Sequence, residues 1–445
     1  MDTPIADFVK NYIKSDSSRF HMPGHKGKGF LGFESYDITE IDGADVLGAA
    51  DGIIKKSEDN ASSLFSSAHT FYTTQGSSTA ICAMLSLVRD NANDRPLILA
   101  ARNVHKSFIH ACALLDYDIE WIMPREMAHI TKCIISSHDV ETAINSCSKK
   151  PSAVFVTSPD YLGNIQDIAS ISEVCHKHDV PLLADNAHGA YLAFTNPRMH
   201  PLYLGADACA DSAHKTLPVL TGGAYLHVSP KAPKNFLQKA RDALTLFSST
   251  SPSYLILQSL DICNAYLSDG FEKKLSECIE NIKKTKKIIS ENGFCILGSE
   301  PLKIVIDAKE SGFIGYELAD ILKSNKNEPE FYDEDYVVLM ITPENRDEDF
   351  ERIKHVFETV RAKMPITKKM FDLPIPSCAM TVREAMFSHS ENVDVSASLG
   401  KICAMPSVSC PPAVPIAVSG EVITEKHIAL FEHYGIDRVK VVLQH

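Results

Sequence analysis

The sequence lacks the features of a secreted or membrane-spanning protein. Its 12 cysteines show no repeated close pairing, which is typical of reduced thiols rather than of a disulfide framework. Residues 1–5 hold no basic segment leading into an apolar core, as a signal peptide would, and no apolar run approaches membrane-spanning length. We therefore expect a soluble protein of the cytoplasm that has no membrane partner.

The sequence also lacks an excess of positive charge, an internal repeat and a clustered set of metal ligands. The formal net charge is −13 over 445 residues, which disfavours nucleic acid as a partner and is compatible with a small cationic substrate. The run Cys175-His176-Lys177-His178 ends an amphipathic helix predicted at residues 168–178 and has no partner cluster elsewhere. We expect no metal site.

Strands and helices alternate from residue 70 onward. Apolar runs predict strands at residues 70–75, 97–100, 119–122, 153–156, 180–185, 205–209 and 222–228, and helices at 80–88, 108–115 and 168–178. Polar clusters follow the carboxyl ends of these strands, where open α/β sheets place their ligand sites. The pattern indicates an α/β fold with a mostly parallel sheet and a site along that edge.

The two ends of the chain show less regular patterns. A helix is predicted at residues 6–13, and the glycine-rich segment 19–29 predicts an irregular loop in an arm that wraps a neighbouring surface. Beyond residue 254 a long helix is predicted to residue 289. Strands at 302–306 and 336–342, with helices at 315–323 and 348–363, indicate a smaller α/β domain. Residues 365–376 predict a linker, and residues 425–434 a last helix.

Lys215 lies in a polar loop predicted at residues 211–218, between two buried strands. A lone lysine in a loop is most often solvated, but Asp185 ends another buried strand thirty positions upstream. Pyridoxal phosphate chemistry needs this pair of residue types: a lysine that holds the aldehyde as an imine, and a carboxylate that keeps the pyridine nitrogen protonated. Desolvation of the lysine would favour the free amine that imine formation requires.

The segment GSST (residues 76–79) opens a predicted helix. A glycine and hydroxyl residues at a helix N-terminus form an anion site, because free amides and the helix dipole point at the same place. An ordinary N-cap explains the same residues equally well. Both interpretations stay open on this segment alone.

Taken together, these motifs are similar to those of the ornithine/lysine/arginine decarboxylase family, in its short form. The matching segments, in chain order, are FHMPGH (20–25), TEIDG (39–43), GSST (76–79), RNVHKS (102–107), TSP (157–159), DNAHG (185–189), SAHK (212–215), Pro411-Pro412 and Gly420-Glu421. Asn186 departs from the family, where an acidic residue is common, and so does the pair Ala413-Val414. These departures concern the substrate more than the chemistry.

The resemblance implies a fold-type-I pyridoxal phosphate enzyme. It divides the chain into an N-terminal arm (1–60), a large cofactor-binding domain (61–255), a small α/β domain (256–370) and a C-terminal domain of the decarboxylase type (371–445). Enzymes of this fold place their active site at a subunit interface. A homodimer, or a larger even oligomer with shared active sites, is therefore expected.

The resemblance also implies a role for each candidate residue. Lys215 would form the imine, Asp185 would pair with the ring nitrogen, His105 would stack on the ring, and His188 would lie near its phenolic oxygen. The phosphate would be held by Gly76, Ser77, Ser78, Ser212 and His214, with Ser251 from a second subunit. Glu330 would bind the far end of a basic substrate, with His25 as a second substrate-binding residue.

The implied function is decarboxylation of arginine, lysine or ornithine to the corresponding amine and carbon dioxide. Two other classes of function use the same residues: an aminotransferase or lyase on the same fold, and a non-catalytic protein that has kept the fold as a binding module. Retention of both Lys215 and Asp185 argues against the non-catalytic class.

Overall fold

The computed structural model describes residues 1–89, 95–123, 129–369, 371, 374–375, 377–408 and 413–443. Pro411 and Pro412 of the proline-rich motif lie outside these residues. Within the described ranges, no helix combines the length and apolar character needed to cross a membrane.

The largest sheet has seven strands in the order β1-β7-β6-β5-β4-β2-β3. Pairs β2–β3 and β5–β6 are parallel, whereas β7 runs antiparallel to both β6 and β1. The α/β class and the mostly parallel sheet predicted from the sequence are confirmed. Strands β2, β5, β6 and β7 are buried throughout, which explains why the sequence shows them as continuous apolar runs rather than as alternating patterns.

The chain divides into two compact units, and the first comprises residues 1–90, 152–155 and 168–273. Its helices are α1 Pro4–Lys14, α2 Ile53–Phe65, α3 Gly76–Leu87, α6 Ile168–Lys177, α7 Ala213–Thr216, α8 Lys234–Thr245 and α9 Tyr254–Ser268. Its strands are β1 His69–Thr73, β5 Leu182–Asp185, β6 Ala208–Asp211 and β7 Ala224–Val228, and β4 Ala153–Thr157 begins in it. Short 3-10 turns lie at Glu34–Tyr36, Leu47–Ala49 and Ala190–Phe194.

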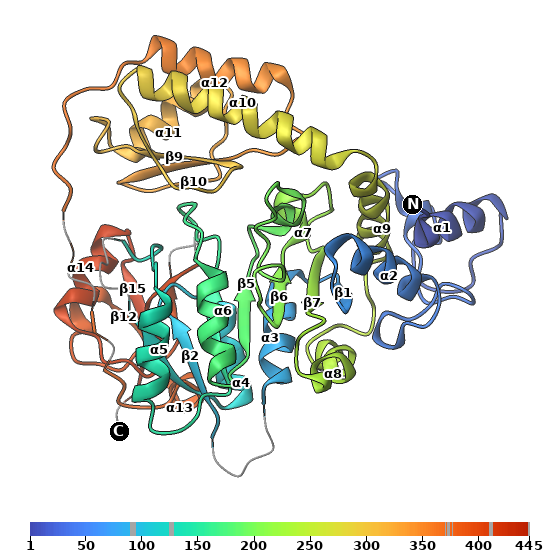
Figure 1. Cartoon of the computed structure of the whole chain (residues 1–445), viewed down its shortest axis with the longest axis horizontal. Helices are drawn as coiled ribbons and strands as arrows, with labels where there is room; N and C mark the ends of the chain where they lie inside the picture. Colours follow the sequence, from blue (N-terminus) through green and yellow to red (C-terminus); the bar gives the residue numbers. More distant parts are fainter. Residues whose placement is uncertain are drawn as a thin grey trace. The chain divides into compact units, whose positions relative to one another are not determined.

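The second unit comprises residues 91–151, 156–167 and 274–445. Its helices are α4 Lys106–Leu115, α5 Ser137–Ser146, α10 Phe271–Glu291 (which starts just before residue 274), α11 Gly315–Ser324, α12 Asp347–Thr359, α13 Val382–Phe387 and α14 Glu425–His433, with a 3-10 turn at Val395–Ala397. Its strands are β2 Leu97–Ala101, β3 Asp118–Ile122, β8 Cys295–Leu297, β9 Lys303–Asp307, β10 Phe331–Tyr332, β11 Tyr336–Met340, β12 Ser390–Asp394, β13 Ser407–Val408, β14 Pro415–Ala417 and β15 Arg438–Val442. Figure 1 shows α10, α11 and α12 on one side of the four-stranded sheet β10-β11-β9-β8.

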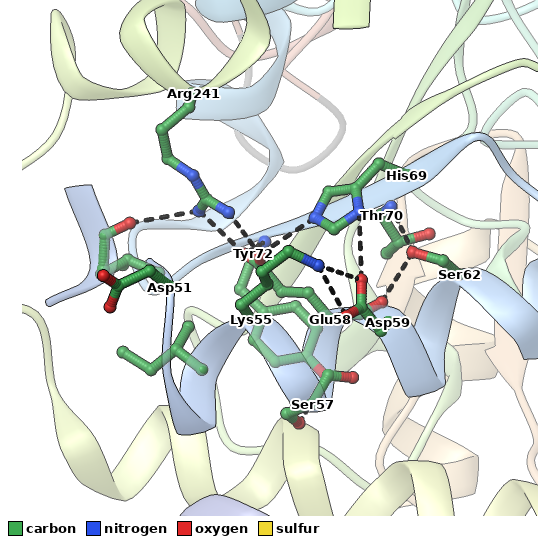
Figure 2. A network of polar contacts seen from close by, with 12 residues as sticks. Asp51, Lys55, Ser57, Glu58, Asp59, Ser62, His69, Thr70, Tyr72 and Arg241 are labelled. Carbon is green, nitrogen blue, oxygen red and sulfur yellow. Dashed lines mark hydrogen bonds and ion pairs between the residues drawn. The ribbon is translucent and has the colours of Figure 1, made fainter. Parts of the chain in front are cut away.

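A buried carboxylate ties several elements of the first unit together. Glu58 of α2 is fully buried and binds both terminal nitrogens of Arg241 from α8, one of them at 2.9 Å (Figure 2). Its oxygens also accept the Tyr72 amide proton of β1 at 2.9 Å and contact His69 Nε2 at 3.1 Å. A buried charge is tolerated only when it is paired and hydrogen-bonded, so this network fixes α2 and α8 against β1.

The N-terminal helix is held by a second buried carboxylate. Asp261 of α9 accepts the amide protons of Ile5 and Ala6, each at 2.9 Å, and thereby caps the first turn of α1. The Ser57 hydroxyl donates to its other oxygen at 2.6 Å. Figure 1 shows α1, α2 and α9 together within the first unit.

Three predicted elements differ from the structure. Residues 211–218 were predicted as a loop, but Ala213–Thr216 form one turn of helix, α7, and Lys215 lies on it. The strand predicted at 205–209 begins three residues later, as β6, Ala208–Asp211. Gly205 has a φ of +107° and ends the preceding turn, so it cannot start the strand. The helix predicted from 255 to 289 is two helices, since Gly270 adopts a φ of +73° between them.

Candidate active site

Strand alternation places two buried carboxylates on opposite faces of the sheet. Asp185 of β5 lies opposite Ala210 of β6 in the parallel register, so it shares a face with Ala210 and not with Asp211. The next residue, Asn186, points to the Asp211 face and donates from Nδ2 to Asp211 Oδ1 at 2.8 Å. The two acids therefore have different neighbours although their strands are paired.

Lys215 and His188 come together on the first unit. Lys215 Nζ lies 3.0 Å from His188 Nε2. His188 follows Asp185 in a tight turn, in which the Gly189 amide donates to the Asn186 carbonyl at 2.8 Å. The one-turn helix α7 follows β6 directly and begins at the residue after Ser212, so two neighbouring strand ends deliver this pair.

Asp185 is 2% exposed and accepts a hydrogen bond from the Ala187 amide at 3.2 Å. Burial raises the pKa of Asp185 to about 6, while the Lys215 ammonium and the Ala187 amide act in the opposite direction and the Asp211 charge adds to the rise. A carboxyl group with this pKa changes protonation just below neutral pH, and it is ionised at pH 7.

Asp211 is the centre of a separate buried network. His200 Nε2 and His227 Nε2 both approach its Oδ2, at 2.9 and 3.2 Å, and all three side chains are fully buried. Burial alone would raise the pKa of Asp211, but electrostatic attraction and hydrogen bonds from the two histidines outweigh it and hold this pKa below its usual range. Asp211 is therefore a buried anion at neutral pH.

Among the described residues, the ligand atoms of these three side chains lie close enough together to hold a metal ion. Their tautomers argue for a hydrogen-bond network instead. His200 Nδ1 accepts the Leu202 amide proton at 3.3 Å, so a neutral His200 carries its proton on Nε2. That nitrogen donates to Asp211 and has no lone pair for a metal ion. Thr70 Oγ1 lies 2.8 Å from His227 Nδ1, which completes the network on β1.

The start of α3 offers amides and hydroxyls to an anion. Its N-cap, Gln75, makes no side-chain cap, and the Ser212 hydroxyl donates to Ser77 Oγ at 2.7 Å. The Gly76 amide is occupied, since it donates to the Gly222 carbonyl at 2.8 Å, so the open amides of the first turn are those of Ser77 and Ser78. Residue 76 is a glycine because its φ of +77° is a backbone conformation that other residues rarely adopt. Lack of space is not the reason, since a Cβ at this position would meet nothing within 4 Å.

His214 lies beside this region on α7. Its Nδ1 donates to the Gly223 carbonyl at 2.9 Å, which directs Nε2 away from that carbonyl. Burial lowers the pKa of His214, the Gly223 hydrogen bond opposes this, and the Lys215 charge lowers it further. A phosphate dianion next to Nε2 would raise the pKa of His214 instead and favour the protonated ring.

Two other predicted residues of the first unit have partners away from Lys215. His25 Nε2 lies 3.2 Å from Asp37 Oδ2, and its Nδ1 accepts the Gly27 amide proton at 3.1 Å. Ser251 is exposed and its amide donates to Ser249 Oγ at 3.1 Å. The Ser249 amide donates in turn to the Gln75 side chain at 3.2 Å, so this loop touches the start of α3 in its own chain.

His105 and Glu330 belong to the second unit. His105 caps α4: its Nδ1 accepts the Ser107 amide proton at 3.2 Å and lies 2.8 Å from the Ser107 hydroxyl, which leaves the ring proton on Nε2. Glu330 is exposed, and its Oε1 accepts the Tyr161 hydroxyl proton at 2.7 Å. The nearby Lys303 is buried and donates to the Asp160 carbonyl at 2.9 Å.

A model of the Orn/Lys/Arg decarboxylase major domain matches residues 3–312 of the chain. The chain belongs to the ornithine/lysine/arginine decarboxylase family. This family consists of pyridoxal phosphate-dependent decarboxylases of basic amino acids, and the family membership inferred from the sequence motifs is confirmed.

Full-length relatives and solved structures agree with this family. The chain is similar to the arginine decarboxylase of Bacillus subtilis (strain 168), with 30% identity covering 96% of this chain and 92% of that protein. It is 28% identical to the arginine decarboxylase of Halalkalibacterium halodurans, with the same two coverages. The Francisella novicida lysine decarboxylase LdcF superposes with a TM-score of 0.80 at 18% identity, covering 99% of this chain and 81% of that one. That structural likeness shows the fold.

The donor set of this decarboxylase fits the family's cofactor. A pyridine nitrogen needs a buried carboxylate, an aldehyde needs a lysine, and a phosphate needs amides and hydroxyls. The first unit holds Asp185, Lys215 and the open first turn of α3 with Ser77 and Ser212. Sequence reasoning missed the Asp211 network with His200, His227 and Thr70, although a histidine inside the apolar strand Ala224–Val228 was a visible signal.

The network yields a prediction for Asn186→Asp. A second carboxylate would face the Asp211 anion at about the distance of the present hydrogen bond, 2.8 Å, so the new acid would keep its proton in the folded state. Its folded pKa would lie above its unfolded value of about 3.9. Between these two pKa values the folded state binds more protons than the unfolded state. The stability of the variant therefore falls as pH rises from the unfolded pKa to the folded pKa. We expect the melting temperature of the variant, relative to wild type, to drop progressively between pH 5 and 8.

Asn186→Ala is the matched control, because it removes the same hydrogen bond without adding a titratable group. It should lose about 1–3 kcal/mol equally at every pH in this range. A flat pH dependence in Asn186→Asp would show that Asp211 is not the anion described here.

Proposed function

We propose that this decarboxylase acts on arginine, with pyridoxal phosphate attached to Lys215. The observation that carries the proposal is the pairing of Lys215 with His188 at the strand ends that also present the buried Asp185. Arginine is placed before lysine and ornithine because the two full-length relatives named above are arginine decarboxylases.

The residues of the first unit would divide the chemistry among them. When bound, the cofactor supplies an electron-accepting ring that takes up the electron pair of the broken Cα–carboxylate bond. Asp185, ionised above pH 6, would hold a proton on the ring nitrogen and so keep the ring cationic. His188 Nε2, 3.0 Å from Lys215 Nζ, can accept the proton that the lysine must lose to become nucleophilic.

The phosphate would bind at the start of α3. The amides of Ser77 and Ser78, with the Ser77 and Ser212 hydroxyls, are the donors there, and His214 would gain a proton from the change in charge. Gly76 would contribute its conformation rather than its amide proton, which Gly222 already takes. Ser251 of a second subunit, and hence a homodimer or larger even oligomer, stays a prediction from the family.

Substrate recognition would fall to Glu330, with His25 as a second substrate-binding residue. His105 would stack on the cofactor ring, the role that the family implies for it. Glu330 is exposed, and its second oxygen is left available when Oε1 accepts the Tyr161 hydroxyl proton. A guanidinium entering a partly desolvated pocket needs such a carboxylate, because an unpaired buried charge is strongly destabilising. Tyr161 would set the direction in which this carboxylate points.

The pKa of Asp185 leads to a prediction about cofactor binding. Below pH 6 the neutral acid cannot neutralise a cationic ring, so affinity should fall about fivefold between pH 6 and 5, and about tenfold per pH unit below pH 5. Pyridoxine 5'-phosphate, which lacks the aldehyde, isolates this effect from reaction with Lys215. Asp185→Asn should bind the analogue more weakly and without this inflection, and the loaded variant should lose several orders of magnitude in decarboxylation. An unchanged profile in the variant would contradict the role of Asp185.

The substrate proposal is tested with arginine, lysine, ornithine and leucine on wild type and on Glu330→Gln. We expect carbon dioxide and amine from arginine foremost, none from leucine, and a KM for arginine raised about 10- to 100-fold in the variant, the effect of a lost charged hydrogen bond. Glu328→Gln, at another exposed carboxylate two positions away, is the control and should behave as wild type. Equal turnover of leucine and arginine would rule out recognition of a basic side chain, and a keto acid product would indicate an aminotransferase.

A further inference from the structure

A buried lysine of the second unit lies against the turn that carries Tyr161. Lys303, the first residue of β9, is 2% exposed, although lysine side chains are rarely buried. Its Nζ donates to the Asp160 carbonyl at 2.9 Å. Its Cδ would lie 3.6 Å from a Cβ at Gly163, so the aliphatic stem passes along the backbone of this turn. The ammonium takes no part in the chemistry assigned to the first unit.

The Asp160 carbonyl that Lys303 contacts also closes the turn. It accepts the Gly163 amide proton at 3.1 Å, so it has two donors. The Asp160 carboxylate is buried as well, and it accepts the amide and the side-chain N–H of Asn164, each at 2.8 Å. Lys303 is therefore one of a small set of contacts that hold the backbone on both sides of Tyr161.

The Lys303 ammonium is the cation of a buried cluster that contains two carboxylates. Glu300 and Asp160 are 1% and 2% exposed. Burial lowers the pKa of Lys303, and the charges of Glu300, Asp160 and Glu330 act in the opposite direction. Burial raises the pKa of Asp160, which the Asn164 hydrogen bonds and the Lys303 charge oppose. Because these carboxylates need the ammonium as a counter-charge, its place beside the turn is fixed.

Tyr161 contacts both this cluster and Glu330. Lys303 Nζ lies 5.9 Å from the centre of the Tyr161 ring, which is within the range of a cation–π interaction. The ring also packs edge-on against Phe331, with 5.3 Å between the ring centres. The Tyr161 hydroxyl donates to Glu330 Oε1 at 2.7 Å. A continuous set of contacts therefore leads from the buried ammonium to the exposed carboxylate.

We propose that Lys303 is a positioning residue for substrate recognition: it holds the turn that carries Tyr161, and Tyr161 in turn directs the Glu330 carboxylate. The inference rests on the proposed function, in which Glu330 binds the far end of the substrate. A carboxylate that is already held in one direction loses less side-chain entropy when a guanidinium binds to it. Lys303 should therefore affect the KM for arginine and leave kcat unchanged.

The charge of Lys303 and its position predict opposite effects on substrate binding. A cation near Glu330 weakens the attraction of that carboxylate for a cationic substrate, so loss of the charge alone would lower the KM for arginine. Loss of the contact with the turn would let Tyr161 and Glu330 move, which would raise this KM. Because Glu330 is exposed and solvent screens its charge, we expect the effect of position to be the larger one.

Steady-state decarboxylation of arginine by the cofactor-loaded enzyme tests the proposal with Lys303→Met, Tyr161→Phe and the double variant. Each single variant should raise KM about three- to tenfold, the effect of one lost hydrogen bond, and keep kcat within about twofold of wild type. The double variant should resemble the single ones, since both changes act on Glu330 through the same hydroxyl. An unchanged or lowered KM in Lys303→Met, or KM effects that multiply in the double variant, would overturn the proposal.

Lys309→Met is the matched control. Lys309 is a second buried lysine, 3% exposed, which follows β9 and pairs with Glu334 and Asp335. Like Lys303→Met, it should lower the melting temperature of the cofactor-free protein, but it should leave the KM for arginine unchanged. A KM that rises equally in both variants would show a general loss of stability and would overturn the positioning role.

Lys303→Arg keeps the buried positive charge and serves in the same measurements if Lys303→Met does not fold. Its larger planar head cannot occupy the place of the ammonium beside Gly163 without shifting the turn. It should therefore raise the KM for arginine, and the increase should not multiply with that of Tyr161→Phe. A wild-type KM in Lys303→Arg would then reject the proposal.

Glu330→Gln separates this inference from the proposed function. If Glu330→Gln and Tyr161→Phe raise the KM for arginine and the Lys303 variants do not, recognition by Glu330 stands and the role of Lys303 is rejected. If Glu330→Gln leaves KM unchanged in an enzyme that still prefers arginine to leucine, the recognition site lies elsewhere and the role of Lys303 is rejected with it. An enzyme without preference for basic amino acids would reject the proposed function itself.

Discussion

Asp185 and Asp211 are carboxylates buried at the ends of the neighbouring strands β5 and β6. The negative charge of each must be stabilised by hydrogen bonds or positive groups of the protein, because water cannot reach it. Asp211 is compensated completely: two histidines and Asn186 surround it, and it remains an anion. Asp185 is compensated only in part, by one amide and by the charge of Lys215, so its pKa rises to about 6. The difference follows from strand alternation, which turns the two side chains to opposite faces of one sheet.

The two faces of the sheet at these strand ends therefore differ in how completely their polar groups are paired. The Asp211 face is rigid, because His200, His227 and Asn186 connect β5, β6, β7 and the loop after the turn Ala190–Phe194. The Asp185 face carries the groups that can take part in chemistry: a carboxyl group with a pKa of about 6, and a lysine next to a histidine. A rigid support below an incompletely satisfied site is what a bound and reacting group requires.

The sequence allowed the fold class and most elements to be predicted, since apolar runs are local signals. The Lys215–Asp185 pair, inferred from polar strand ends, stays a prediction. The sequence did not reveal the helical turn that carries Lys215, because four residues are too few for a periodic pattern. The break at Gly270 was visible as a glycine but not as a positive φ. The Asp211 network could not be predicted, because its members come from residues 70, 186, 200, 211 and 227 and meet only through sheet register.

The central claim is that Lys215 of this family member holds the cofactor that performs decarboxylation. Borohydride reduction of the cofactor-loaded enzyme, followed by proteolysis and mass spectrometry, tests it directly because reduction fixes the cofactor to the lysine that carries it. We expect one modified lysine per chain, Lys215, and no fixed cofactor in Lys215→Ala. Modification of another lysine, or an unchanged adduct in Lys215→Ala, would contradict the account.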